Sequence, residues 1–241
     1  MKTLLFVLFP LLSLAQPNTL TAKEKREGWK LLFDGQTATG WRGAYRDKFP
    51  TAGWSVEDGT LSIAKTDGSE SRNAGDIVTT SEYANFDLTF EFRLTEGANS
   101  GLKYFVVEHQ PKPAGSAFGL EYQVLDDAKH PDAKMGRDGN RTVSSLYDLM
   151  PAQNKAVNPI GEWNRARVLV RGTHVEHWLN DKKVLEYERG NEAFRELVAK
   201  SKYATPAYNA NGRFGEAPKG HILLQDHGDR VSFRSIKIRE L

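Results

Sequence analysis

Apolar and polar residues alternate with a period of two along most of the chain after residue 28. In the stretch 86–94 an apolar residue stands at every even position, and Asp87, Thr89, Glu91 and Arg93 stand at the odd positions. Successive side chains of a strand point to opposite faces of its sheet. The pattern therefore predicts a strand with one face in a core and one polar face.

The same alternation, interrupted by Gly, Asn and Asp at the turns, predicts twelve strands in all. Their bounds are 30–33, 54–57, 60–64, 77–79, 86–94, 100–107, 120–125, 164–171, 174–179, 182–187, 221–226 and 231–240. Helical spacing predicts one turn over 21–27 and one helix over 192–200. Many short strands with tight turns predict an all-β fold, an antiparallel sandwich or jelly roll.

The first sixteen residues have the form of a secretory signal peptide. Lys2 precedes an apolar run over 4–14, and small residues then offer a cleavage site after Ala15. The run is shorter than the ~20 apolar residues of a membrane span, and no other segment is long and apolar enough for one. We expect an exported protein, periplasmic or extracellular, with a signal peptide at 1–16, a linker at 17–28 and one domain at 29–241.

Composition narrows the classes of function. The chain has no cysteine, which excludes disulfides, thiolate metal sites and a cysteine nucleophile. The formal net charge is only +2, and we expect no nucleic-acid partner, because such a partner would require a basic patch. Aromatic residues make up 10% of the chain and include five Trp, which is compatible with stacking on sugars as well as with core packing.

The strand predicted at 120–125 carries the most informative candidate chemistry. Glu121 and Gln123 share its polar face, ~6.6 Å apart. An amide can hold a polyhydroxylated ligand, and a carboxylate can also move a proton. Gln225 and His227 share a face in the same way at the end of the strand predicted at 221–226. We expect these four side chains to line one groove.

Several motifs in a fixed order resemble the 3-keto-disaccharide hydrolase family, which is abundant in Bacteroidetes. The resemblance covers about 29–241, with Ser235 standing where the family usually has Asn. The motifs lie at 32–35, 40–41, 54–59, 85–88, 99–101, 121–126, 146–148 with Pro151, 161–164, 178–180, 224–228 and 231–236.

The resemblance implies a concanavalin A-like jelly roll of two curved antiparallel sheets, with a ligand groove on the concave one. It also implies cleavage of glycosides oxidised at C3, by elimination. A ketone at C3 acidifies the C2 hydrogen, so a base can remove it and the enolate can expel the C1 substituent before water adds. Such a site needs a base, a donor for the enolate oxygen and an acid for the leaving group. The E-x-D-x-x-E strand of many glucanases of this fold is absent.

Glu121 is the first candidate for the catalytic base or for an orienting carboxylate. His227 is the second candidate for the base, because a neutral imidazole suits proton transfer near neutral pH, and a turn role beside Gly228 is its alternative. Other roles remain open for five further residues. Glu91 can pair with Arg93, Asn99 can serve a turn, and Tyr147 and Asp148 can serve packing. The candidate substrate-binding residues are Gln123, Gln225, Glu91, Arg93, Asn99, Tyr147 and Asp148.

No metal site is predicted, and no cofactor is assigned, although the sequence leaves a divalent metal open. His174 and His177 lie three apart on a strand and so point to opposite faces. The segment 126–132, with three Asp and His130, is interpreted as a solvated loop. The expected partner is a small-molecule carbohydrate. A non-catalytic lectin-like module and a conventional glycosidase are the alternative functions, since this sandwich also serves lectins.

Overall fold

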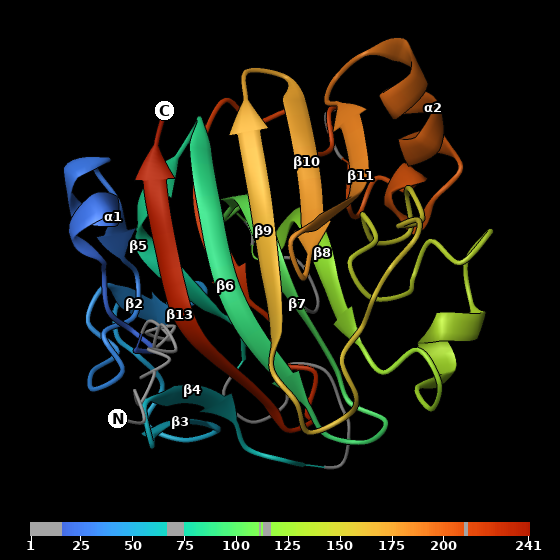
Figure 1. The fold of residues 1–241 in the computed structure, drawn as a ribbon. Coiled ribbons are helices and arrows are strands. Elements are labelled where there is room, and N and C mark those ends of the chain that lie inside the picture. Colours follow the sequence, from blue (N-terminus) through green and yellow to red (C-terminus); the bar gives the residue numbers. More distant parts are fainter. Residues whose placement is uncertain (1–15, 67–74, 111, 113–116, 210–211) are drawn as a thin grey trace, which may run out of the picture.

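Two antiparallel β-sheets stack face to face around a shared hydrophobic core (Figure 1). The computed structural model describes residues 16–66, 75–110, 112, 117–209 and 212–241. All but the last residue of the predicted signal peptide lie outside the described residues. The prediction of an all-β jelly-roll sandwich is confirmed.

The larger sheet has eight strands, and Figure 1 shows β13, β6, β9 and β10 side by side in front of β7 and β8. β1 (Lys30–Leu31) pairs with β13 beside the main path of this sheet. The order along that path is β11 (Lys182–Glu188), β10 (His174–Leu179), β9 (Asn164–Arg171), β6 (Phe86–Leu94), β13 (Val231–Glu240), β4 (Thr60–Ile63) and β3 (Trp54–Glu57).

The smaller sheet has five strands and carries the candidate chemistry. Its order is β2 (Trp41–Gly43), β5 (Ile77–Tyr83), β12 (Gly220–Leu224), β7 (Asn99–Val107) and β8 (Phe118–Leu125). The sequence pattern did not predict β2, and it ended β5 at Thr79. Residues 80–82 of β5 are polar and exposed on both faces, so they carry no alternation that could mark a strand.

Helices cover little of the molecule. α1 (Ala22–Arg26) begins after Thr21, whose side chain forms a reciprocal capping box with Glu24. α2 (Glu192–Ala199) buries Phe194 and Val198, and the other helical elements of the described residues are the 3-10 turns η1 (Pro131–Lys134) and η2 (Lys202–Ala204). In the described ranges, no helix is both long and apolar enough to cross a membrane.

The alternation on β6 and β8 places the core where the sequence predicts it. The even-numbered residues of both strands face inward, and Phe90 of β6 meets Tyr122 of β8 edge to face, with ring centroids 5.4 Å apart. Glu121 and Gln123 therefore face outward from the small sheet. They are nevertheless only 3% and 1% exposed, so this outer face is covered rather than solvated.

His177 is a core residue, not a ligand. Its Nδ1 donates to the Ser144 carbonyl at 2.9 Å, and its Nε2 lies 2.8 Å from the Tyr104 hydroxyl. Burial lowers the pKa of this imidazole to about 4, although the bond to Ser144 opposes the shift. The fold therefore holds His177 in its neutral form.

This burial predicts an acid-sensitive fold. The folded pKa lies below the unfolded value of ~6.5, so the stabilisation is complete above that value and is lost as the pH falls toward 4. Between pH 7.5 and pH 5 we expect the free energy of unfolding to fall by about 2 kcal/mol from this group. Urea denaturation at both pH values should show that His177→Gln flattens the dependence. The control His174→Gln removes a half-exposed imidazole whose pKa is raised by Glu188, a shift of the opposite sign, so this variant should retain the loss. An unchanged slope in His177→Gln would contradict the assignment.

Candidate active site

Polar side chains form two rows across the outer face of the small sheet. In one row Lys103 of β7 stands opposite Glu121 of β8. In the next row Gly101 stands opposite Gln123, and the Gln225 backbone N–H donates to the Gly101 carbonyl at 2.9 Å. Lys103, Glu121, Gln123 and Gln225 are all less than a tenth exposed. The structure therefore brings three of the four residues predicted for one groove onto one buried sheet face.

The Glu121 carboxylate is the centre of this cluster. Its Oε2 lies 3.8 Å from the Lys103 ammonium, and both side chains are almost completely buried. With its nitrogen as donor, the Gln123 amide lies 3.1 Å from Glu121 Oε1 and 3.0 Å from the Ser100 carbonyl. Buried charges are tolerated when they are paired and hydrogen-bonded. The cluster therefore holds a carboxylate, an ammonium and an amide in a setting of low polarity.

Gly101 provides the room that the carboxylate occupies. A Cβ atom at this position would lie 2.3 Å from Glu121 Oε1, which is closer than real Cβ contacts allow. The glycine of the Asn99-Ser100-Gly101 motif thus serves the position of Glu121 rather than a turn.

A loop follows the free edge of β8 and brings Tyr147 next to Glu121. The loop backbone at residues 144 and 145 exchanges hydrogen bonds with the Gln123 backbone, and the Tyr147 N–H donates to the Glu121 carbonyl at 3.0 Å. Burial raises the pKa of the Tyr147 phenol above its ordinary value, and the nearby Glu121 and Asp132 carboxylates add to this shift. Tyr147 is therefore a neutral hydroxyl group. Asp148 accepts hydrogen bonds from Arg141 Nε and the Lys202 backbone, both at 2.7 Å, which ties the loop to the body of the protein.

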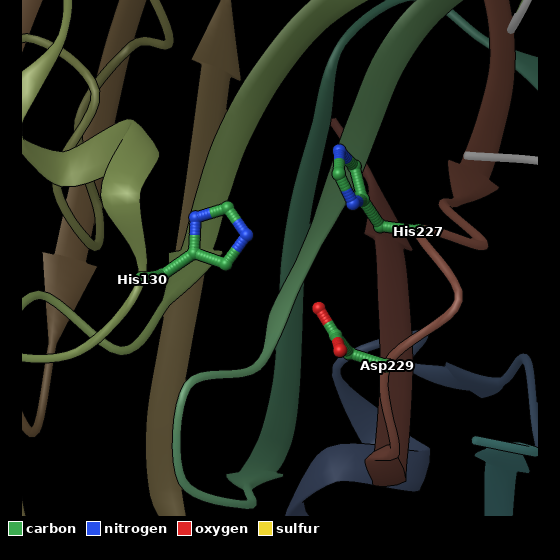
Figure 2. Close-up of side chains that lie close together, drawn as sticks. All are labelled: His130, His227 and Asp229. Atoms are coloured by element: carbon green, nitrogen blue, oxygen red, sulfur yellow. The ribbon is translucent and has the colours of Figure 1, made fainter. Parts of the chain in front are cut away.

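His227 lies beyond the end of the polar rows, in the connection between β12 and β13. Figure 2 shows it together with His130 and Asp229, and one ligand atom from each lies within 4.8 Å of the others. Asp229 Oδ2 also accepts the Asn99 backbone N–H at 3.0 Å. Asn99 begins β7, two residues before Gly101, so this trio adjoins the cluster around Glu121.

The acidic residues of the 126–132 loop have other partners. Asp127 pairs with Lys155 at 2.6 Å, Asp132 pairs with Arg141 at 2.9 Å, and Asp126 accepts the Gly97 backbone N–H at 2.7 Å. A second group of possible ligands, His174 with Glu176 and Glu186, lies on the strands β10 and β11 of the other sheet, with Glu186 exposed.

The structure does not bring Glu91 and Arg93 together with Glu121. Both stand on the outer face of the large sheet, because Phe90 and Phe92 beside them face the core. Glu91 accepts a hydrogen bond from Arg234 Nε at 2.5 Å, and the Arg93 guanidinium lies 4.7 Å from the centre of the Trp163 ring. The two residues therefore face the opposite side of the sandwich and cannot share a groove with Glu121. The alternation correctly placed both side chains on the polar face of their strand. It could not tell to which of the two sheets that strand belongs.

Sequence reasoning missed Lys103. Its signal was present, because Lys103 is the only charged residue in the otherwise apolar run over 102–107. Like Asn99 and Gly101 it stands at an odd-numbered position, and so on the same face of the predicted strand. A buried lysine in the middle of a strand is rare unless it is paired, so this position could have been singled out.

A β-sandwich that buries a carboxylate, an ammonium and amides on one sheet face is suited to a polyhydroxylated ligand, which places it with carbohydrate-active proteins. Residues 28–239 match the model of the 3-keto-alpha-glucoside-1,2-lyase-like domain, and the chain belongs to this family. This confirms the resemblance found in the sequence.

Similar proteins also belong to the carbohydrate-active class. The chain is 36% identical to a 3-keto-disaccharide hydrolase of Bacteroides thetaiotaomicron, over 95% of this chain and 84% of that one. A solved structure from Parabacteroides distasonis, described as a candidate glycosyl hydrolase, is 32% identical, with a TM-score of 0.79 over 94% of this chain and all of that one. A second such structure from the same organism is 28% identical, with a TM-score of 0.60 over 83% of this chain. These relatives support the expectation of a glycoside-acting, carbohydrate-active enzyme.

Proposed function

We propose that this protein cleaves glycosides whose sugar carries a ketone at C3, by removing the C2 proton and eliminating the C1 substituent, after which water adds. The observation that carries the proposal is the buried Glu121–Lys103 pair. A conventional glycosidase uses two carboxylates that flank the bond. Here the groups in contact with the Glu121 carboxylate include an ammonium and an amide, which suits proton abstraction and stabilisation of an enolate.

Each side chain of the cluster has a role in this reaction. Glu121 accepts the C2 proton and, once protonated, returns it to the oxygen of the C1 leaving group, while the cation of Lys103 stabilises the negative charge that develops on the C3 oxygen. The amides of Gln123 and Gln225 hold sugar hydroxyl groups. Tyr147, as a neutral phenol beside Glu121, is a hydrogen-bond donor at the border of the cluster.

A direct test compares a 3-keto-glucoside that carries a chromophoric leaving group with the same glucoside before oxidation. We expect release of the chromophore from the oxidised substrate and little or none from the other, because only the ketone acidifies C2. Rapid cleavage of the unoxidised glucoside would indicate a conventional glycosidase. Binding of sugars without cleavage of either compound would indicate a lectin-like module.

Deuterium at C2 tests the order of bond breaking. If removal of the C2 proton limits the rate, the C2-deuterated keto-glucoside should turn over several-fold more slowly than the protiated one. If removal is reversible, deuterium should instead wash out of recovered substrate, as mass spectrometry would show. Cleavage at an unchanged rate with full retention of deuterium at C2 in the product would contradict elimination.

A further inference from the structure

We propose that His130, His227 and Asp229 bind one divalent transition-metal ion at the end of the small sheet. The three side chains come from two loops far apart in the sequence. His130 follows β8, whereas His227 and Asp229 lie between β12 and β13 (Figure 2). Their potential ligand atoms lie within 4.8 Å of one another, a separation that a central ion can bridge after small side-chain rotations.

Two features of the histidines point to a ligand. His227 Nδ1 is shielded from solvent, yet it has no hydrogen-bond partner among the residues that the structure describes. Buried polar atoms are rarely left unpaired, so this nitrogen calls for an explanation. The Asp132 backbone N–H lies 3.2 Å from His130 Nδ1, and Figure 2 shows the other ring nitrogen, Nε2, directed toward His227 and Asp229.

The surroundings of Asp229 also suit a metal ligand. The Asp229 oxygen that accepts the Asn99 N–H gives the carboxylate a fixed orientation, as the neighbours of metal ligands commonly do.

The donor set indicates the class of ion. Two imidazole nitrogens and one carboxylate favour Zn²⁺, Co²⁺, Fe²⁺ or Mn²⁺ over Ca²⁺ or Mg²⁺, which prefer oxygen ligands. Three protein ligands leave coordination positions open for water or a substrate oxygen. Coordination through His130 Nε2 places the ring proton on Nδ1, which can then no longer accept the Asp132 N–H. We therefore expect the backbone at Asp132, in the first turn of η1, to move away from the ring when the ion binds.

One consequence rests on the proposed function, whereas metal binding itself does not. If His227 is a metal ligand, it is not the proton carrier, and Glu121 alone remains as the base. The ion adjoins Asn99, and its open positions can then polarise an oxygen of a sugar bound against Gln123 and Glu121.

The test is titration of the chelator-treated full-length chain with ZnCl₂ and CoCl₂ by calorimetry and visible absorption. We expect one bound ion per chain, cobalt absorption bands and a higher thermal midpoint with zinc. His130→Gln and Asp229→Asn should each weaken binding at least ~10-fold, the effect found even for neighbours of ligands. Asp229→Asn keeps an oxygen for the Asn99 N–H, and circular dichroism should confirm that both variants fold.

His174→Gln is the matched control, because it makes the same change in the other group of possible ligands. Unchanged binding in this variant supports the site. Absence of binding, loss of binding in His174→Gln alone, or unchanged binding in both His130→Gln and Asp229→Asn would overturn it. Cleavage of the keto-glucoside is measured separately. A chain that binds the ion but cleaves nothing contradicts the proposed function and not the metal site.

Discussion

Glu121→Gln is expected to lower kcat for cleavage of a 3-keto-glucoside by ~10²-fold or more. Glutamine has nearly the same shape and can keep the neighbouring contact with Gln123, which lies 3.1 Å from the present carboxylate. Its amide cannot accept the C2 proton. KM should change less than kcat, because the amides of Gln123 and Gln225 still hold the sugar. Steady-state kinetics with the chromogenic keto-glucoside would measure both constants.

Glu91→Gln is the matched comparison. It makes the same chemical change on a strand carboxylate, but Glu91 lies on the opposite side of the sandwich, where it pairs with Arg234. We expect its kcat and KM to stay close to those of the unchanged protein. Full activity in Glu121→Gln, or an equal loss in both variants, would remove Glu121 from the role of base.

The period-two pattern predicted most of the fold because it reports which way each side chain points. It gave the bounds of β9, β10 and β13 as the structure has them, and it placed Glu121 and Gln123 on the face away from the core. The turn residues between strands supplied the antiparallel connections. These are local properties, so a single sequence carries them.

The composition of the site depends on contacts that no local pattern records. The alternation treats Glu91 and Glu121 alike, and only the pairing of whole strands places them on different sheets. His130 lies in a loop without periodicity, and its approach to His227 depends on where β8 and β12 end. Burial of the polar face is also a tertiary effect, so the alternation alone could not show that Glu121 and Gln123 lie in a covered cluster.

Lys103→Met is expected to lower kcat by ~10²-fold, because loss of one donor to a developing oxyanion typically lowers kcat by about this factor. Methionine fills much of the same space but carries no charge. The substitution also leaves the Glu121 carboxylate buried without the ammonium that now lies 3.8 Å away. Removing one partner of a buried pair typically costs about 3–5 kcal/mol, so the thermal midpoint should fall as well. Activity must therefore be measured per folded molecule, at a temperature well below that midpoint.

The double variant Lys103→Met/Glu121→Gln separates catalysis from stability. Both buried charges are then gone, so much of the stability lost in Lys103→Met should return, since replacing a whole buried pair is often neutral. Turnover should not return, because neither the base nor the cation is present. Recovery of both stability and turnover in the double variant would show that the pair only maintains the fold. Full turnover in Lys103→Met alone would assign the enolate oxygen to another donor.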